Sequence, residues 1–200
     1  MADAALATRP FAAGGGWPGL DTDEPLVEAD WVFGYGSLIW DPGFEAEEAL
    51  LGRLHGYHRA FCIRSTRYRG TPESPGVVLG LDRGGSCTGM AFRLPAATRR
   101  QTIRMLYERE MPNRVYVPKR LAVTLVDGRD VQALAFVANR ASHAYERLSD
   151  DEILRRLNGC CGLRGENRDY AINTWRALTG HGVFCQHLGR IAQRLLQPGG

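Results

Sequence analysis

Hydrophobic and polar positions follow two different periods along the chain. Short runs rich in valine, leucine and phenylalanine, bounded by glycine, proline or aspartate, predict strands at 57–63, 76–82, 88–94, 121–128 and 131–139. The last two runs flank "DGRD", which is typical of a hairpin turn. Helical spacing of apolar residues follows over about 96–110, 149–159, 168–179 and 184–196. Because strands lead and helices dominate the end, the pattern predicts the α+β class, without regular βαβ repeats.

The first part of the chain lacks either period. Residues 1–29 are rich in alanine, glycine, proline and aspartate, which predicts a flexible tail that contacts the rest of the protein through Trp17. The 200 residues are enough for one substantial hydrophobic core but hardly for two. We therefore expect a single domain over residues 30–197.

Composition narrows the class of protein. The net charge is only +3, and the basic residues are scattered arginines apart from Lys119, which argues against a nucleic-acid partner. No apolar run approaches the ~18 residues of a membrane span, and no basic segment precedes an apolar one at the N-terminus. Five cysteines, an odd number without metal-ligand spacing, indicate reduced thiols and no zinc site. We expect a soluble, cytoplasmic protein without a membrane partner.

The stretch "WVFGYGSLIW", residues 31–40, places glycines inside an apolar segment. It resembles neither complete G-x-G-x-x-G nor G-x-S-x-G, because Ile39 stands where each motif requires its last glycine. What remains is a turn whose backbone N–H groups converge on an anion or a developing oxyanion. The alternative is a glycine-rich corner between a strand and a loop that binds nothing.

The segment around residues 96–116 directs a carboxylate inward. Ile103, Leu106 and Tyr107 mark an apolar helix face, and Glu110 continues that face at the i+7 position. Glu108 falls about 140° away at 100° per residue and follows Arg104 by four residues, so we expect it in a solvent-side ion pair. Pro112 is expected to end the helix directly after Glu110.

Glu110 is therefore predicted to be buried at a helix C-terminus. Both desolvation and the negative end of the helix dipole penalise its charged form, so its pKa should be raised toward the range of a useful acid or base. The alternative is a structural glutamate that is paired with one of the many arginines.

At this point the chain resembles the ChaC-type γ-glutamylcyclotransferases that act on glutathione. The resemblance covers roughly residues 31–190 and rests on motifs in a specific order. They are "VFGYGSLIW", "RSTRYRGTPESPG", "GMAFRLP" leading into "YEREM", Tyr116, and "CGLRGENRDY". The chain departs from shorter relatives in its N-terminal tail and in "MPNRVY", residues 111–116, where some members carry a glycine pair.

The resemblance implies a small mixed β-barrel surrounded by helices, with a pocket at the barrel mouth and no metal or organic cofactor. In the family, the loop that matches Tyr35, Gly36, Ser37 and Leu38 holds the γ-glutamyl group. The glutamate that matches Glu110 is the catalytic acid and base, and the tyrosine that matches Tyr170 lines the pocket. The implied substrate is glutathione, which is cyclised to 5-oxoproline with release of Cys-Gly.

Several residues and functions stay open. Arg64, Arg67 and Arg69 lie in a polar loop, and one of them, with Arg69 as our candidate, is expected to bind the glycine carboxylate of glutathione through a bidentate contact. The alternative for each of the three is a solvated loop charge. Tyr116 and Tyr170 either donate phenol hydrogen bonds to the substrate or are buried tyrosines whose hydroxyls are hydrogen-bonded within the protein. The rival functions are cyclisation of other γ-glutamyl amines or amino acids and non-enzymatic regulation of cation transport. The sequence does not specify the oligomeric state.

Overall fold

The computed structural model describes residues 26–111 and 114–197, so most of the expected tail, with Trp17, and the helix-ending Pro112 lie outside the described residues. After a long hairpin, the strands come in pairs that are separated by single helices, and two helices end the described chain. The elements are β1 Trp31–Gly34, the 3-10 turn η1 Ser37–Ile39, β2 Glu48–Ser65, β3 Gly76–Arg93, α1 Arg99–Glu110, β4 Tyr116–Leu125, β5 Asp130–Ala138, α2 Asp150–Gly159, β6 Cys161–Gly162, β7 Gly165–Glu166, α3 Asn167–Gly180 and α4 Gln186–Leu196.

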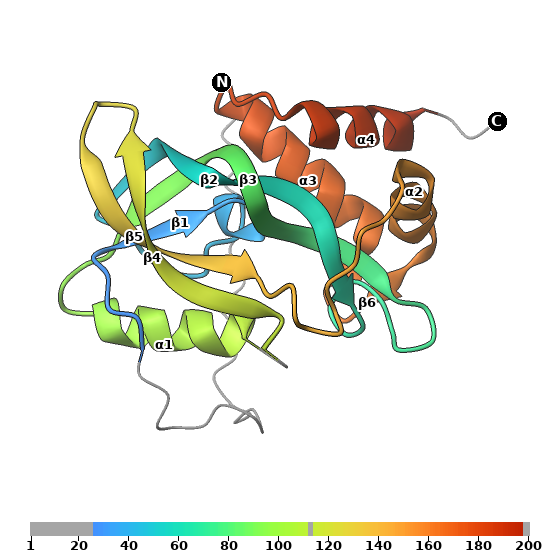
Figure 1. Cartoon of the computed structure of the whole chain (residues 1–200), viewed down its shortest axis with the longest axis horizontal. Coiled ribbons are helices and arrows are strands. Elements are labelled where there is room, and N and C mark those ends of the chain that lie inside the picture. The colour runs from blue at the N-terminus through green and yellow to red at the C-terminus, as the bar shows by residue number, and fades with distance from the viewer. Residues whose placement is uncertain (1–25, 112–113, 198–200) are drawn as a thin grey trace, which may run out of the picture.

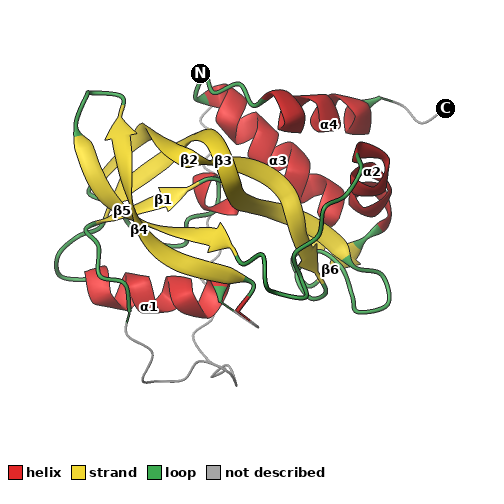
Figure 2. Ribbon diagram, viewed as in Figure 1, coloured by secondary structure: helices red, strands yellow, loops and turns green. Residues whose placement is uncertain are grey.

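The strands close into a mixed barrel of order β1-β3-β2-β4-β5 (Figure 1). Most neighbouring pairs are antiparallel, whereas β1 runs parallel to β5, with Trp31 opposite Ala133. Helix α1 covers one side of the barrel, and helices α2, α3 and α4 gather at another (Figure 2). The α+β class and the small barrel with surrounding helices are thus confirmed.

Both strands of the long hairpin, β2 and β3, are longer than the sequence pattern predicts. The runs 76–82 and 88–94 were expected as separate strands, but both belong to β3, which pairs with β2 along its length. The apparent break is Gly84 and Gly85, whose φ angles of +100° and +70° accompany a register shift opposite Gly56 while the pairing continues. Likewise, β2 begins at Glu48, well before the predicted 57–63.

The predicted hairpin around "DGRD" is present. Strand β4 starts at Tyr116, earlier than the predicted 121–128, because Tyr116 already pairs with Ala138 of β5. It ends at Leu125, where the amide of Gly128, at φ +88°, donates to the Leu125 carbonyl. The helices lie close to their predicted ranges, since their apolar spacing is set by the helix period itself.

Strand β1 is buried on both faces, which explains its uninterrupted apolar sequence. Trp31 and Phe33 face one hydrophobic cluster, shared with helices α2, α3 and α4. Val32 faces the other cluster, where the apolar face of α1 packs against β5. In this second cluster the rings of Tyr107 and Phe136 meet edge to face, with centroids 5.6 Å apart.

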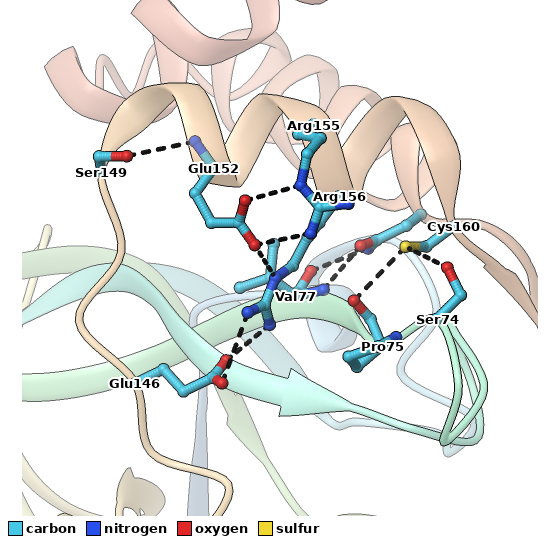
Figure 3. A network of polar contacts seen from close by, with 10 residues as sticks. Ser74, Pro75, Val77, Glu146, Ser149, Glu152, Arg155, Arg156 and Cys160 are labelled. Carbon is cyan, nitrogen blue, oxygen red and sulfur yellow. Dashed lines mark hydrogen bonds and ion pairs between the residues drawn. The ribbon is translucent and has the colours of Figure 1, made fainter.

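Polar contacts hold α2 against the segment before it and link the end of the helix to the long hairpin. The Ser149 hydroxyl caps α2 by accepting from the Glu152 amide, and Arg156 donates to Glu152 and to Glu146 at 2.7 and 2.6 Å (Figure 3). At the end of the helix, the Cys160 thiol lies 3.4 Å from the Pro75 carbonyl oxygen, beside the β2–β3 loop (Figure 3). The end of the hairpin is therefore tied to α2, next to the start of α3.

The last residues of the expected tail touch the barrel domain. The Val27 amide donates to the Tyr107 hydroxyl at 2.8 Å, and Ala29 is buried against the α1 cluster. Within the described ranges, none of the helices is both long and apolar enough to cross a membrane.

Candidate active site

One cavity of about 520 Å³ opens between α1, the β1–η1 loop, the end of β2 and the start of α3. All of the residues that the sequence singled out line this cavity. They are Tyr35, Gly36, Ser37, Leu38, Arg69, Glu110, Tyr116 and Tyr170. Residues up to 135 positions apart in the chain, from Tyr35 to Tyr170, thus come together in one concave site.

The loop after β1, which lines this cavity, has three backbone amides without a partner among the described residues. The Ile39 amide donates to Gly36 O at 3.1 Å and the Asp41 amide to Ser37 O at 2.7 Å, which forms the short η1 turn. Among the described residues, none accepts a hydrogen bond from the backbone N–H of Gly36, Ser37 or Leu38. Buried amides are normally paired, so these three donors form a cradle suited to an anionic group.

The two glycines of this loop serve different purposes. A Cβ on Gly34 would lie 3.0 Å from the Leu38 Cβ and 3.1 Å from the Phe92 ring, so this glycine allows close packing inside the protein. A Cβ on Gly36 would lie 3.0 Å from the Tyr170 hydroxyl oxygen. Gly36 therefore keeps space at the point where the amide cradle meets Tyr170.

Glu110 is the last residue of α1, and its side chain keeps 18% of its surface exposed, toward the cavity it lines. The predicted face is correct, because Ile103, Leu106 and Tyr107 are all buried. Burial raises the pKa of the Glu110 carboxyl, while the positive charges of Arg109 and Arg164 act in the opposite direction. Glu110 is thus both the inward carboxylate and the partner of an arginine.

Arg109 connects this carboxylate to the loop. Its Nε lies 3.1 Å from Glu110 Oε1, and its Nη2 donates to Ser37 Oγ at 3.0 Å. Its Nη1 donates to the carbonyl oxygens of Asp41 and Pro42 at 2.8 and 3.2 Å. The guanidinium has 7% of its side-chain surface exposed, so a buried cation holds helix end and loop together.

Three of the four tyrosines that line the cavity, Tyr35, Tyr116 and Tyr170, have hydroxyls that are differently engaged. Tyr35 donates to the Phe136 carbonyl at 2.8 Å, and Tyr116 donates to the Leu79 carbonyl at 3.0 Å. Tyr170 instead accepts from the Leu79 amide at 3.1 Å, so its own proton remains for another acceptor. Burial raises the pKa of all three phenols, which keeps them as neutral hydrogen-bonding groups.

The docking of α3 onto β3 places Tyr170. One turn before Tyr170, the fully buried Asn167 accepts from the Val77 amide at 2.7 Å and donates to the Val77 carbonyl at 2.8 Å. Asn167 and Tyr170 therefore contact the backbone of β3 at two positions on the same side of the strand. These contacts therefore fix the position of Tyr170 in the wall of the cavity.

Arg69 lies on the α3 side of the cavity. Its guanidinium lies 5.6 Å from the centre of the Tyr170 ring and donates to the Glu166 carbonyl at 3.0 Å. Burial lowers the pKa of Arg69, with the charge of Arg164 acting in the same direction. The positive charge therefore lies beside the phenol that borders Gly36.

The structure corrects one expectation and adds one residue. Glu108 was expected on the solvent side, but it is half-buried and lines the cavity, because the loop and the end of β2 form walls beyond the helix itself. Arg109 was missed, although its position three residues after Leu106 places it on the inward-facing side of α1.

Within the described ranges, no group of three or more His, Cys, Asp or Glu side chains is placed to hold a metal ion.

Comparison with known proteins identifies the family. The family model described as "ChaC-like protein" matches residues 30–195. The chain belongs to the ChaC-like family. The glutathione-specific γ-glutamylcyclotransferase of Escherichia coli strain K12 is 41% identical over 141 residues, which cover 70% of this chain and 61% of that protein. The chain thus spans about three fifths of that relative.

Two further proteins align with the chain over more of their own length. The γ-glutamylcyclotransferase 2-3 of Arabidopsis thaliana is 30% identical over 178 residues, which cover 84% of this chain and 88% of that protein. The crystal structure of a yeast γ-glutamyl cyclotransferase specific to glutathione superposes with a TM-score of 0.76 at 19% identity, covering 84% of this chain and 96% of that chain. The superposition shows that the barrel and its helices have the same fold.

Proposed function

We propose that this protein is a glutathione-specific γ-glutamylcyclotransferase that releases 5-oxoproline and Cys-Gly. The observation that carries the proposal is the shared cavity, which is lined both by Glu110, a largely buried carboxyl with a raised pKa, and by Gly36, Ser37 and Leu38, whose amides have no described partner. Membership of the ChaC-like family and the activity named for the Escherichia coli relative support it.

The reaction requires a base, an oxyanion site and a curled substrate. The α-amine of the γ-glutamyl group attacks its own γ-carbonyl carbon and closes a five-membered lactam, while the bond to the cysteinyl nitrogen breaks. Glu110 takes one proton from the α-ammonium and delivers it to the departing nitrogen. The attacking nitrogen loses its second proton as the lactam N–H forms, and the released amine takes it up, so Cys-Gly leaves as an ammonium and no water is consumed. Orienting an intramolecular attack in this way is worth about 7–11 kcal/mol of barrier.

The loop amides bind the anionic parts of the substrate. The N–H groups of Gly36, Ser37 and Leu38 receive the α-carboxylate, and one of them or the Ser37 hydroxyl stabilises the tetrahedral oxyanion. The Tyr170 hydroxyl, which accepts from Leu79, donates its own proton to the substrate. Tyr35 and Tyr116 form the wall, with hydroxyl protons already committed to backbone carbonyls.

Arg69 and Arg109 supply positive charge to the two sides of this site. Arg69 lies over the Tyr170 ring and attracts the substrate carboxylate that the amides bind. Arg109 holds the Ser37 loop at a fixed distance from Glu110 and keeps the carboxyl pKa from rising further. The raised but restrained pKa suits a group that must first accept and then donate a proton.

We propose that the enzyme works in the cytoplasm and that residues 30–197 form the catalytic unit. Every described residue that lines the cavity comes from this range. The five cysteines are free thiols, which fits a reducing compartment.

The test is incubation of the purified protein with glutathione, followed by measurement of 5-oxoproline and Cys-Gly in equal amounts. Faster release from other γ-glutamyl amines or amino acids would transfer the assignment to the rival cyclotransferase, which uses the same γ-glutamyl site. Binding of γ-glutamyl compounds without any 5-oxoproline would favour a non-enzymatic binding role, such as regulation of cation transport.

A further inference from the structure

A second cavity of about 420 Å³ adjoins the active site at the end of β2. Arg64, Thr66 and Arg114 line both cavities. The remaining walls of the second cavity come from the loop after β5, through Asn139, Ser142, His143 and Ala144. No carboxylate lines this cavity among the described residues, whereas Glu108 and Glu110 line the first one. In the described part of the chain, the second cavity is therefore lined by arginines without a carboxylate, whereas the first cavity has both arginines and carboxylates.

Arg64 stands at the boundary between the two cavities. Its backbone is held firmly, because its amide donates to the Ala144 carbonyl at 2.8 Å and it pairs with Val77 in the β2–β3 ladder. Its guanidinium has no hydrogen-bond or ion-pair partner in the described part of the chain, and the Nε atom is buried. A buried unpaired donor is costly, so such a group indicates a partner that arrives from outside the chain.

The neighbouring arginines are already engaged. The guanidinium of Arg69 donates to the Glu166 carbonyl and lies over Tyr170, and that of Arg67 lies 5.7 Å from the centre of the Tyr68 ring. Of the three arginines that the sequence placed in this segment, Arg64 is the one whose planar donor face is available for a carboxylate.

We propose that Arg64 binds the terminal carboxylate of the leaving dipeptide and that the second cavity receives its glycine end. This inference rests on the proposed function and names the group that distinguishes glutathione from shorter γ-glutamyl compounds. The γ-glutamyl end lies at the loop amides and Glu110, so the leaving half extends toward the boundary that Arg64 lines. A guanidinium and a carboxylate then form a charge-assisted pair.

The experiment compares two substrates that differ only at that carboxylate, glutathione and the same tripeptide with its glycine carboxyl converted to an amide. Release of 5-oxoproline from each is measured with the wild type, Arg64→Met, Arg64→Lys and a control. The control is Arg53→Met, an exposed arginine of the same strand outside both cavities. Thermal melting establishes that each variant is folded.

For the wild type we expect kcat/KM to be about 10- to 100-fold higher for glutathione than for the amide, the range of a hydrogen bond to a charged group. Arg64→Met should abolish this preference, mainly by raising KM for glutathione, while Arg64→Lys should retain part of it. Arg53→Met should keep the wild-type preference.

Two results would overturn the inference and leave the proposed function intact. One is a wild type that turns over both tripeptides equally. The other is an Arg64→Met variant in which kcat/KM falls by the same factor for both, because Arg64 would then act on something other than the carboxylate. Absence of 5-oxoproline from the wild type with either substrate would refute the proposed function itself.

Discussion

Arg109 Nε lies 3.1 Å from the Oε1 atom of its own neighbour in sequence, Glu110, while the same guanidinium donates to Ser37 Oγ at 3.0 Å. One planar cation therefore joins the carboxylate at the end of α1 to the loop that carries the free amides. Because the guanidinium is rigid, the distance between the proposed base and the proposed anion cradle is fixed before substrate binds.

The first prediction concerns Glu110→Gln. The substitution preserves shape and removes the proton-carrying function, so 5-oxoproline release should fall by about 10²–10⁴-fold or more. The variant should still fold and bind glutathione, which thermal melting and calorimetric binding would measure.

Glu73→Gln, at an exposed position in the β2–β3 loop, is the matched control and should remain active. Glu108 is unsuitable because it lines the cavity. An active Glu110→Gln enzyme would refute the assigned mechanism.

A second prediction concerns the pH profile after removal of Arg109. Its charge lowers the pKa of Glu110 against the effect of burial, so Arg109→Met should raise that pKa further. Since the base must be ionised, the rising limb of kcat/KM against pH should move to higher pH. The loss of the loop contacts should reduce kcat/KM at the optimum by about 10²-fold in addition.

Arg109→Lys separates these two effects. A lysine keeps the charge but cannot reach Ser37, Asp41 and Pro42 together. In Arg109→Lys the rising limb of kcat/KM against pH should therefore lie closer to its wild-type position than in Arg109→Met, while the maximal kcat/KM stays low. If the limb stays in place in Arg109→Met, Arg109 does not set the pKa of Glu110.

The third prediction concerns stability. Burial raises the pKa of Glu110 above its ordinary value of 4.5, so its contribution to stability is present below that value and is lost as the pH rises through the folded-state pKa. Gln mimics the protonated carboxyl at every pH. The melting temperature of Glu110→Gln should therefore match the wild type at acidic pH and exceed it increasingly as the pH rises. A constant difference across this range would contradict the raised pKa.

The fourth prediction tests the space beside the amide cradle. The Cβ of Gly36→Ala would lie 3.0 Å from the Tyr170 hydroxyl, which is held by Leu79, so loop or tyrosine must shift. We expect kcat/KM for glutathione to fall by about 10-fold or more with little change in melting temperature. Gly159→Ala, where a Cβ meets nothing within 4 Å, is the control. Full activity of Gly36→Ala would show that the cradle tolerates a side chain there.

The inward position of Glu110 was predictable because it depends on one helix. Ile103, Leu106 and Tyr107 define a face, and the helix period places Glu110 on it regardless of the remaining fold. The burial of Arg109 was not predictable in the same way. It depends on Ser37, Asp41 and Pro42, which lie about 70 positions earlier in the chain, and an arginine without such partners faces solvent.

The errors in the strands and at Glu108 have a similar origin. Gly84 and Gly85 have the composition of a turn, yet β3 passes through them because β2 accommodates the irregularity at Gly56. Glu108 was placed by its angle on an isolated helix, whereas the neighbouring loop encloses that side of α1. Local spacing therefore determined which residues face inward, while the walls of the cavity required tertiary contacts. The barrel itself was expected from the family resemblance and from no single run of residues.

The docking of α3 onto β3 has a consequence for how the family can diverge. Asn167 and Tyr170 contact peptide groups at positions 77 and 79, and every amino acid except proline offers the same donor and acceptor there. Mutational drift in the strand can therefore exchange one aliphatic side chain for another without tilting the helix. Substitution of Asn167 or Tyr170 removes the side-chain group that makes the contact. In a saturation library, many residues should therefore be tolerated at positions 77 and 79, and few at positions 167 and 170.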